Sequence, residues 1–172
     1  MRQKRTPQLI GVRHVGLSAR DPAALAAFYR DVLGLQVVPT DTSALGATAF
    51  LSSRPAEGLL DVTLFANPAY QHTAFEVRSL ADLRALHQRV LGRGVPVKMA
   101  LTHGVSLSFY FVDPEGHMVE VYWPTGVACR PRHGEPIDLT RSEEALRRDA
   151  AELAAQAGTP SAAGGAEPGG RW

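Results

Sequence analysis

Two histidines and one glutamate in this chain have the residue types of a metal site. His14 and His72 each open one copy of a sequence repeat, and Glu120 follows the turn sequence DPEG. Two histidines and one carboxylate on one face form a set typical of non-haem Fe(II), and they leave other coordination positions open. We therefore expect these three residues to bind Fe(II), although the ligand set is also compatible with Mn(II).

An internal repeat places the two histidines at equivalent positions. HVGLSARDPAALAAFYRDVLG, from His14 to Gly34, aligns without a gap on HTAFEVRSLADLRALHQRVLG, from His72 to Gly92. Each copy is predicted to be a strand followed by a helix, because both contain a helix start signal and a terminal glycine. The start signals are Asp21 with Pro22 in the first copy and Ser79 with Asp82 in the second.

Three strand-like runs follow each predicted helix, so the order is βαβββ twice. In the first module, about 9–66, they are Leu35–Pro39, Ala47–Leu51 and Leu59–Phe65. In the second module, about 70–124, they are Val95–Leu101, Val105–Val112 and His117–Trp123. This order predicts an α+β domain over residues 1–124, in which two half-barrel sheets form a cup suited to a ligand.

Strand alternation indicates which residues face into the cup. In the last strand, the residues that share one face are Met118, Glu120 and Tyr122. In the strand before it, they are Ser106, Ser108 and Tyr110. We expect these polar faces to line the cup, so that Glu120 meets His14 and His72.

Other titratable residues are not expected to bind the metal. Isolated histidines are more often packed or hydrogen-bonded than ligating. We predict that His87 and His133 lie at the surface and that His117 lies in a solvated turn. Asp61 is either a surface residue or a fourth ligand, and we favour the surface residue.

The composition favours a globular protein without a nucleic-acid or membrane partner. Of the 172 residues 45% are apolar, and the formal net charge of +1 gives no strong field for an anionic partner. The apolar stretch after the basic start is interrupted by Arg13 and His14, which argues against a signal peptide or a membrane span. Cys129 is the single cysteine, so an internal disulfide is excluded and a cytoplasmic location is expected.

The composition changes after Pro124, and residues 125–172 are predicted to form a C-terminal extension. A helix is expected at about 141–157, with Thr140 and Glu143 as its capping box. The Gly-, Ala- and Pro-rich end that follows is predicted to be disordered. Because half-barrel sheets leave strand edges that need cover, we expect a homodimer, with Thr140–Ala157 as a candidate contact.

These motifs resemble those of the vicinal oxygen chelate superfamily, which includes glyoxalases, bleomycin resistance proteins and dioxygenases. HGVSLSFYFVDPEGHMVE, from His103 to Glu120, is similar to the signature of type I extradiol ring-cleavage dioxygenases. The resemblance covers about Leu9 to Trp123. It implies that Tyr110 hydrogen-bonds a bound catecholate and that His103 lines the substrate pocket. The iron ligands that it implies are His14, His72 and Glu120.

One position departs from the pattern of these dioxygenases. Related enzymes usually carry a His-His-Asp run in the last strand of the first module, and its second histidine acts as acid and base. The run here is Leu59-Leu60-Asp61, so that proton-handling group is absent. His103, assisted by Tyr110, is the expected substitute.

The resemblance implies an Fe(II)-dependent dioxygenase that inserts both atoms of O2 into a small aromatic diol and opens its ring. Two alternatives remain, a glyoxalase-type metal-dependent lyase or isomerase and a metal-free drug-binding protein of the same fold. The Ala-, Arg-, Gly- and Pro-rich composition is typical of a GC-rich genome, such as that of an actinomycete. Similar single-domain enzymes there open DOPA-like catechols in natural-product synthesis, and the loss of the usual histidine favours such a specialised catechol.

Overall fold

The structure, a computed structural model, confirms the two βαβββ modules and the α+β class. It describes residues 6–39, 45–57, 59–127 and 134–157. The first module consists of β1 (Leu9–Ser18), α1 (Pro22–Leu33), β2 (Gln36–Val37), β3 (Thr48–Ser52) and β4 (Val62–Phe65). The second consists of β5 (His72–Val77), α2 (Leu80–Gly92), β6 (Val97–Thr102), β7 (Ser106–Val112) and β8 (Met118–Pro124). Single-turn helices η2 (Pro55–Glu57) and η3 (Pro68–Tyr70) flank β4.

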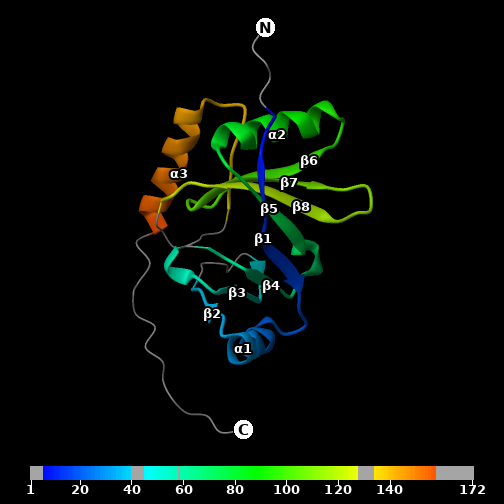
Figure 1. Cartoon of the computed structure of the whole chain (residues 1–172), viewed down its shortest axis with the longest axis vertical. Coiled ribbons are helices and arrows are strands. Elements are labelled where there is room, and N and C mark those ends of the chain that lie inside the picture. The colour runs from blue at the N-terminus through cyan, green and yellow to red at the C-terminus, as the bar shows by residue number, and fades with distance from the viewer. Residues whose placement is uncertain (1–5, 40–44, 58, 128–133, 158–172) are drawn as a thin grey trace.

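One continuous sheet joins the two modules. In the described residues the strand order is β2-β3-β4-β1-β5-β8-β7-β6-β9, and β1 pairs antiparallel with β5 at the junction. Within each module the first strand pairs parallel with the last, β1 with β4 and β5 with β8. Figure 1 shows α1 and α2 at opposite ends of the view, each beside the strands of its own module.

Most of the predicted helix signals are confirmed. The Asp21 side chain accepts hydrogen bonds from the first turn of α1, Ser79 caps α2, and Gly34 ends α1 with a left-handed φ of 74°. The prediction for Gly92 was wrong. Helix α2 includes Gly92, and the left-handed residue is Gly94, with φ 73°, because the closing hydrogen bonds extend the last turn to Arg93.

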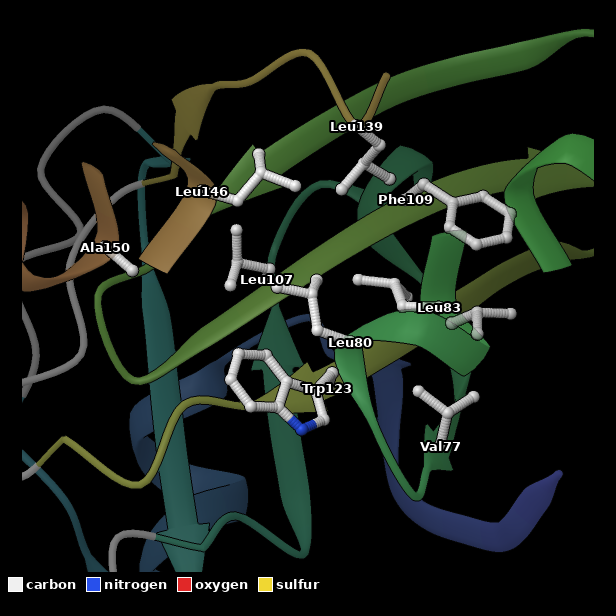
Figure 2. Packing of buried hydrophobic residues seen from close by; sticks show 10 residues of the cluster. Val77, Leu80, Leu83, Leu107, Phe109, Trp123, Leu139, Leu146 and Ala150 are labelled. Carbon is white, nitrogen blue, oxygen red and sulfur yellow. The ribbon is translucent and has the colours of Figure 1, made fainter. Parts of the chain in front are cut away.

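The two modules have hydrophobic cores of different size. In the second module, large side chains from the sheet, α2 and the C-terminal extension pack together, as Figure 2 shows. Its buried residues are Val77, Leu80, Leu83, Leu107, Phe109, Val121, Trp123, Leu139, Leu146 and Ala150. The first module has a smaller cluster, which contains Ala19, Ala26, Ala49, Leu51 and Leu64.

The C-terminal extension packs on the second module of its own chain. Strand β9 (Glu135–Pro136) pairs with β6, and helix α3 (Glu143–Ala157) inserts Leu146 and Ala150 into the second core. The helix is capped by Ser142, whose Oγ accepts from Ala145 N at 3.2 Å. The predicted capping box was therefore wrong, because the Thr140 hydroxyl donates instead to Asp138 at 2.7 Å.

Several predictions are not tested by the described residues. Cys129, His133 and the end after residue 157 lie outside them. The domain division after residue 124 and the homodimer stay predictions. Among the described helices, none combines the length and the apolar character needed to cross a membrane.

Candidate metal centre

His14, His72 and Glu120 converge on one point of the central sheet. His14 Nε2 lies 3.2 Å from His72 Nε2 and 3.2 Å from Glu120 Oε2, and His72 Nε2 lies 3.3 Å from the same oxygen. The strand pairing explains the geometry, because His14 pairs with Ala74 and Ala74 pairs with Glu120. His72 shares a face with Ala74, two residues away on β5. The prediction that these three side chains meet is therefore confirmed.

Two local features make room for the histidine rings. The register between β1 and β5 shifts between Val12 and His14, so Arg13 is an extra residue in a bulge directly before the first histidine. Such bulges redirect neighbouring side chains. A β-carbon on Gly16 would lie 2.5 Å from His72 Nδ1, so glycine is required there for the second ring to fit.

A second layer of groups orients the ligands. His72 Nδ1 donates to the Tyr70 carbonyl at 2.7 Å, which turns Nε2 toward the site. The Tyr122 ring packs against the His14 ring with centroids 5.5 Å apart, and its hydroxyl donates to Glu76 at 3.3 Å.

The negative charge of Glu120 is stabilised by its hydrogen bonds to His14 and His72. Glu120 is 3% exposed, and this burial would raise the pKa of its carboxyl group. Hydrogen bonds and positive charge from His14 and His72 outweigh burial and hold that pKa well below its usual range. Burial opposes the charged form of His72, but Glu120 and the Tyr70 carbonyl raise the His72 pKa. The triad is therefore a buried carboxylate held by two imidazoles.

The donor set fits a divalent transition metal. Metal–ligand bonds of about 2.1 Å at right angles would separate neighbouring donor atoms by about 3.0 Å. The observed separations of 3.2–3.3 Å are close to this value. The three ligand atoms come from three neighbouring strands and form a compact group of the kind that holds such an ion.

The triad forms part of the wall of a cavity of about 480 Å³. Its other walls are mainly apolar and include Phe50, Leu60, Phe65, Met99 and Leu101. Of the residues on the strand faces predicted to line it, Ser106, Tyr110, Met118 and Glu120 border the cavity, whereas Ser108 and Tyr122 do not. The cavity is large enough for a substituted aromatic ring next to the triad.

Tyr110 and His103 stand together beside the triad. The Tyr110 hydroxyl lies 3.4 Å from His103 Nε2, and the Tyr110 ring lies edge-on to His72, with centroids 6.0 Å apart. Burial, followed by the negative charge of Glu120, raises the Tyr110 pKa well above its usual value. Tyr110 therefore stays protonated near neutral pH and can donate a hydrogen bond.

A comparison with protein families matches residues 11–121 to the Glyoxalase/Bleomycin resistance protein/Dioxygenase superfamily. The matched stretch contains all three converging ligands and most of both modules. The chain belongs to this superfamily. The match ends at residue 121, before the C-terminal extension begins.

Relatives in the superfamily differ in what they do. Biphenyl-2,3-diol 1,2-dioxygenase 3 of Rhodococcus globerulus is 32% identical over 123 residues, which are 67% of this chain and 63% of that protein. A Mn(II)-bound glyoxalase from Novosphingobium aromaticivorans has a TM-score of 0.57 at 27% identity, covering 74% of this chain and 42% of that one. A catechol 2,3-dioxygenase structure has a TM-score of 0.60 at 21% identity, covering 79% and 50%. The chain thus spans less than two thirds of these relatives.

In the last strand of the first module, Thr63 stands at the position that corresponds to Glu120 in the second module. Gly16 and Ala74 each lie two residues after a ligand histidine, and their parallel partners are Thr63 and Glu120. Thr63 is therefore the internal-symmetry mate of Glu120. Thr63 carries a hydroxyl group instead of a carboxylate, and this hydroxyl donates to the Val15 carbonyl at 3.4 Å.

The structure places the remaining candidates away from the triad. Asp61 is partly exposed, and its carboxylate accepts a hydrogen bond from Ser53 N rather than joining the triad. His117 is exposed and pairs with Asp113 at 3.0 Å, as predicted for a solvated turn.

The prediction for His87 was wrong. The residue is 8% exposed and packs edge-on to Phe109, with ring centroids 5.2 Å apart. It lies four residues after the buried Leu83 in α2, a spacing that places it on the inner helix face. That spacing was the signal that could have identified it as buried.

Proposed function

We propose that this chain is an Fe(II)-dependent extradiol dioxygenase that opens the ring of a small catechol with O2. The observation that carries the proposal is a three-ligand triad beside an apolar cavity, with Thr63 in place of a fourth ligand. Three ligands on one face leave room for both catechol oxygens and for O2. The likeness to a biphenyl-2,3-diol dioxygenase supports the same reaction class.

The reaction balances without an external reductant, since both oxygen atoms of O2 remain in the ring-opened product. When bound, iron supplies Lewis acidity toward the diol and electron transfer toward O2. Tyr110 donates a hydrogen bond to a catecholate oxygen and orients the ring. His103 accepts a proton from a catechol hydroxyl and later returns it. It takes this role because Leu60, which stands in the cavity wall where related enzymes carry the acid–base histidine, cannot transfer a proton. The apolar walls exclude water from the reacting ring.

A glyoxalase-type lyase or isomerase is the second candidate, favoured by the 27% identity to a Mn(II)-bound glyoxalase. Such enzymes usually take a further ligand from the last strand of the first module, and Thr63 stands at that position. A metal-free binding protein would have no use for a buried, ionised carboxylate between two histidines. We therefore favour the dioxygenase.

The finer features of the proposal concern substrate, metal and assembly. The mainly apolar wall suits a catechol with a small substituent, and a DOPA-like catechol stays a prediction. Fe(II) is proposed over Mn(II) because the proposed reaction class uses electron transfer from the metal toward O2.

A homodimer is proposed because Val37 on the edge strand β2 is half-exposed and such edges need cover. Light scattering tests the assembly, and a monomer would contradict it.

The decisive experiment uses full-length protein reconstituted with Fe(II) under anaerobic conditions. Addition of a simple catechol and then air should give a yellow ring-opened product and consume one O2 per catechol. His103→Ala should keep its iron and turn over about a hundredfold more slowly or worse. Tyr110→Phe should lose less activity. A colourless mixture with no O2 uptake would contradict the dioxygenase and favour the glyoxalase-type reaction.

A further inference from the structure

The segment just before helix α3 is fixed against the second module although it lies beyond the superfamily match. Glu135 and Pro136 pair with β6, and Ile137 N donates to the Ala100 carbonyl at 3.0 Å. Arg84 of α2 donates to the Leu139 carbonyl at 3.0 Å and to the Thr140 carbonyl at 3.3 Å. Residues 134–140 therefore form a strap that runs from the cavity to α2, and we use that name below.

The strap begins inside the wall of the cavity. Gly134 is buried and borders the cavity together with Glu135 and Pro136. A β-carbon on Gly134 would lie 2.8 Å from His103 Cε1 and 2.8 Å from Leu101 Cδ1. Real β-carbons do not approach other atoms this closely, so the glycine backbone is in direct contact with the His103 ring.

A line of contacts connects this glycine to the metal centre. Gly134 contacts the His103 ring, His103 Nε2 lies 3.4 Å from the Tyr110 hydroxyl, and Tyr110 lies edge-on to His72. His103 lies in the turn between β6 and β7, and its backbone N donates to the Ser106 carbonyl at 2.9 Å. The hairpin therefore holds the backbone, and the contacts of the ring decide where Nε2 points.

We propose that Gly134 is a positioning residue for His103, so that the C-terminal extension is a working part of the active site. The strap holds the imidazole against the cavity wall with Nε2 directed at Tyr110. This inference rests on the proposed function for the role of His103, but the contact itself does not. It gives the extension a role in proton handling that the superfamily match does not cover.

The test is Gly134→Ala in full-length, Fe(II)-reconstituted protein. The added methyl group must push the His103 ring aside, so kcat should fall about tenfold or more while iron content stays at the wild-type level. Gly92→Ala is the matched control, because a β-carbon there meets nothing within 4 Å. It should leave the turnover unchanged.

A double-mutant cycle separates positioning from simple packing. In a His103→Ala background, Gly134→Ala should have almost no further effect on kcat, because the group that it displaces is gone. Equal losses in both backgrounds, or wild-type turnover in the single variant, would overturn the proposal. If Gly134→Ala fails to fold, adding Leu101→Ala removes the Leu101 Cδ1 contact, so the closest remaining contact of the new methyl group is the His103 ring at 2.8 Å, ahead of Leu101 Cβ at 3.0 Å.

A readout without catalysis keeps the inference separate from the proposed function. In the zinc-loaded, diamagnetic protein, Gly134→Ala should shift the imidazole NMR resonances of His103 and leave those of the exposed His117 unchanged. If wild-type protein opens no catechol but this shift appears, the dioxygenase fails and the positioning contact stands. If the His103 resonances do not move, the positioning role is excluded.

Discussion

Helices α1 and α2 occupy equivalent places in the repeat, yet they differ in how much of their apolar surface is covered. Phe28 and Val32 of α1 are 55% and 61% exposed. Their counterparts in α2, Leu86 and Val90, pack against the second core. The repeat therefore fixes the path of the chain in both modules, but it does not fix how well each module is packed.

The chemistry is divided as unevenly as the packing. The second module supplies His72 and Glu120 together with the residues next to them, Tyr110 and His103, while the first module supplies the single ligand His14 and much of the apolar wall. Thr63 shows the same asymmetry at one position, since it occupies the place of Glu120 without a carboxylate. In the proposed reaction, the first module mainly encloses the substrate and the second module carries most of the reacting groups.

The largest expected effect tests whether both modules must contribute ligands. His72→Ala and His14→Ala should each remove most of the bound metal and all ring cleavage, because two donors do not hold the ion in a fixed geometry. Metal content by elemental analysis and catechol turnover are the measurements. The exposed His117→Ala serves as the control. Retention of wild-type iron in either ligand variant would contradict the shared site.

Thr63→Glu would make the two modules alike at the metal. A carboxylate at the symmetry position should take one of the open coordination positions, so metal affinity should rise while catechol turnover falls at least about tenfold. Thr63→Gln is the control, because it has nearly the same size without the charge. If Thr63→Glu still cleaves catechol at the wild-type rate, the assignment of Thr63 as the mate of Glu120 in the site is wrong.

The difference in packing can be measured with a symmetry-related pair of leucines. Leu83 is fully buried in the second core, whereas its counterpart Leu25 is partly buried beside the first. Leu83→Ala should lower the free energy of unfolding by about 3 kcal/mol, and Leu25→Ala by about half as much. Denaturant titration gives both values. Equal losses would show that the first module is packed as tightly as the second.

The smallest expected effect concerns His87, whose counterpart in α1 is Tyr29. Burial lowers the His87 pKa, and the negative charge of Asp138 offsets this in part. Stability from the neutral ring is fully present above about pH 6.5 and is lost as the pH falls through the lower folded-state pKa. His87→Phe removes this dependence and keeps an aromatic contact with Phe109. Melting temperatures between pH 7.5 and 5 should fall less in the variant than in the wild type, and parallel curves would contradict this.

Local patterns in the sequence predicted the parts of the molecule that depend on local physics. Strand alternation placed Glu120 and Tyr110 on the cavity side, because side chains alternate with a period of two along a strand. The repeat placed His14 and His72 at equivalent positions of the two modules. The roles of Gly16, Thr63 and the bulge at Arg13 depend on which residues pair across strands. That pairing is set by the whole sheet, so no single segment reveals it.

Two predictions failed where the sequence offered more than one local signal, at the start of α3 and at His87. Thr140 has a glutamate three residues later, as a capping box requires, but Ser142 is also a favourable N-cap residue, and its Oγ is the one that accepts from the first turn of the helix. His87 was judged as an isolated histidine, although its spacing from Leu83 already placed it on the inner face of α2. The role of Gly134 required the three-dimensional position of the strap.

The antiparallel junction between β1 and β5 sets the order in which this molecule can form. Each module can pair its first strand with its last without the other module, but His14 meets Glu120 only after the two halves have joined. Contacts between such distant parts of a chain form late in folding. An ion that bridges β1, β5 and β8 would therefore slow unfolding and leave the folding rate nearly unchanged. Metal release would then set the lifetime of the folded protein.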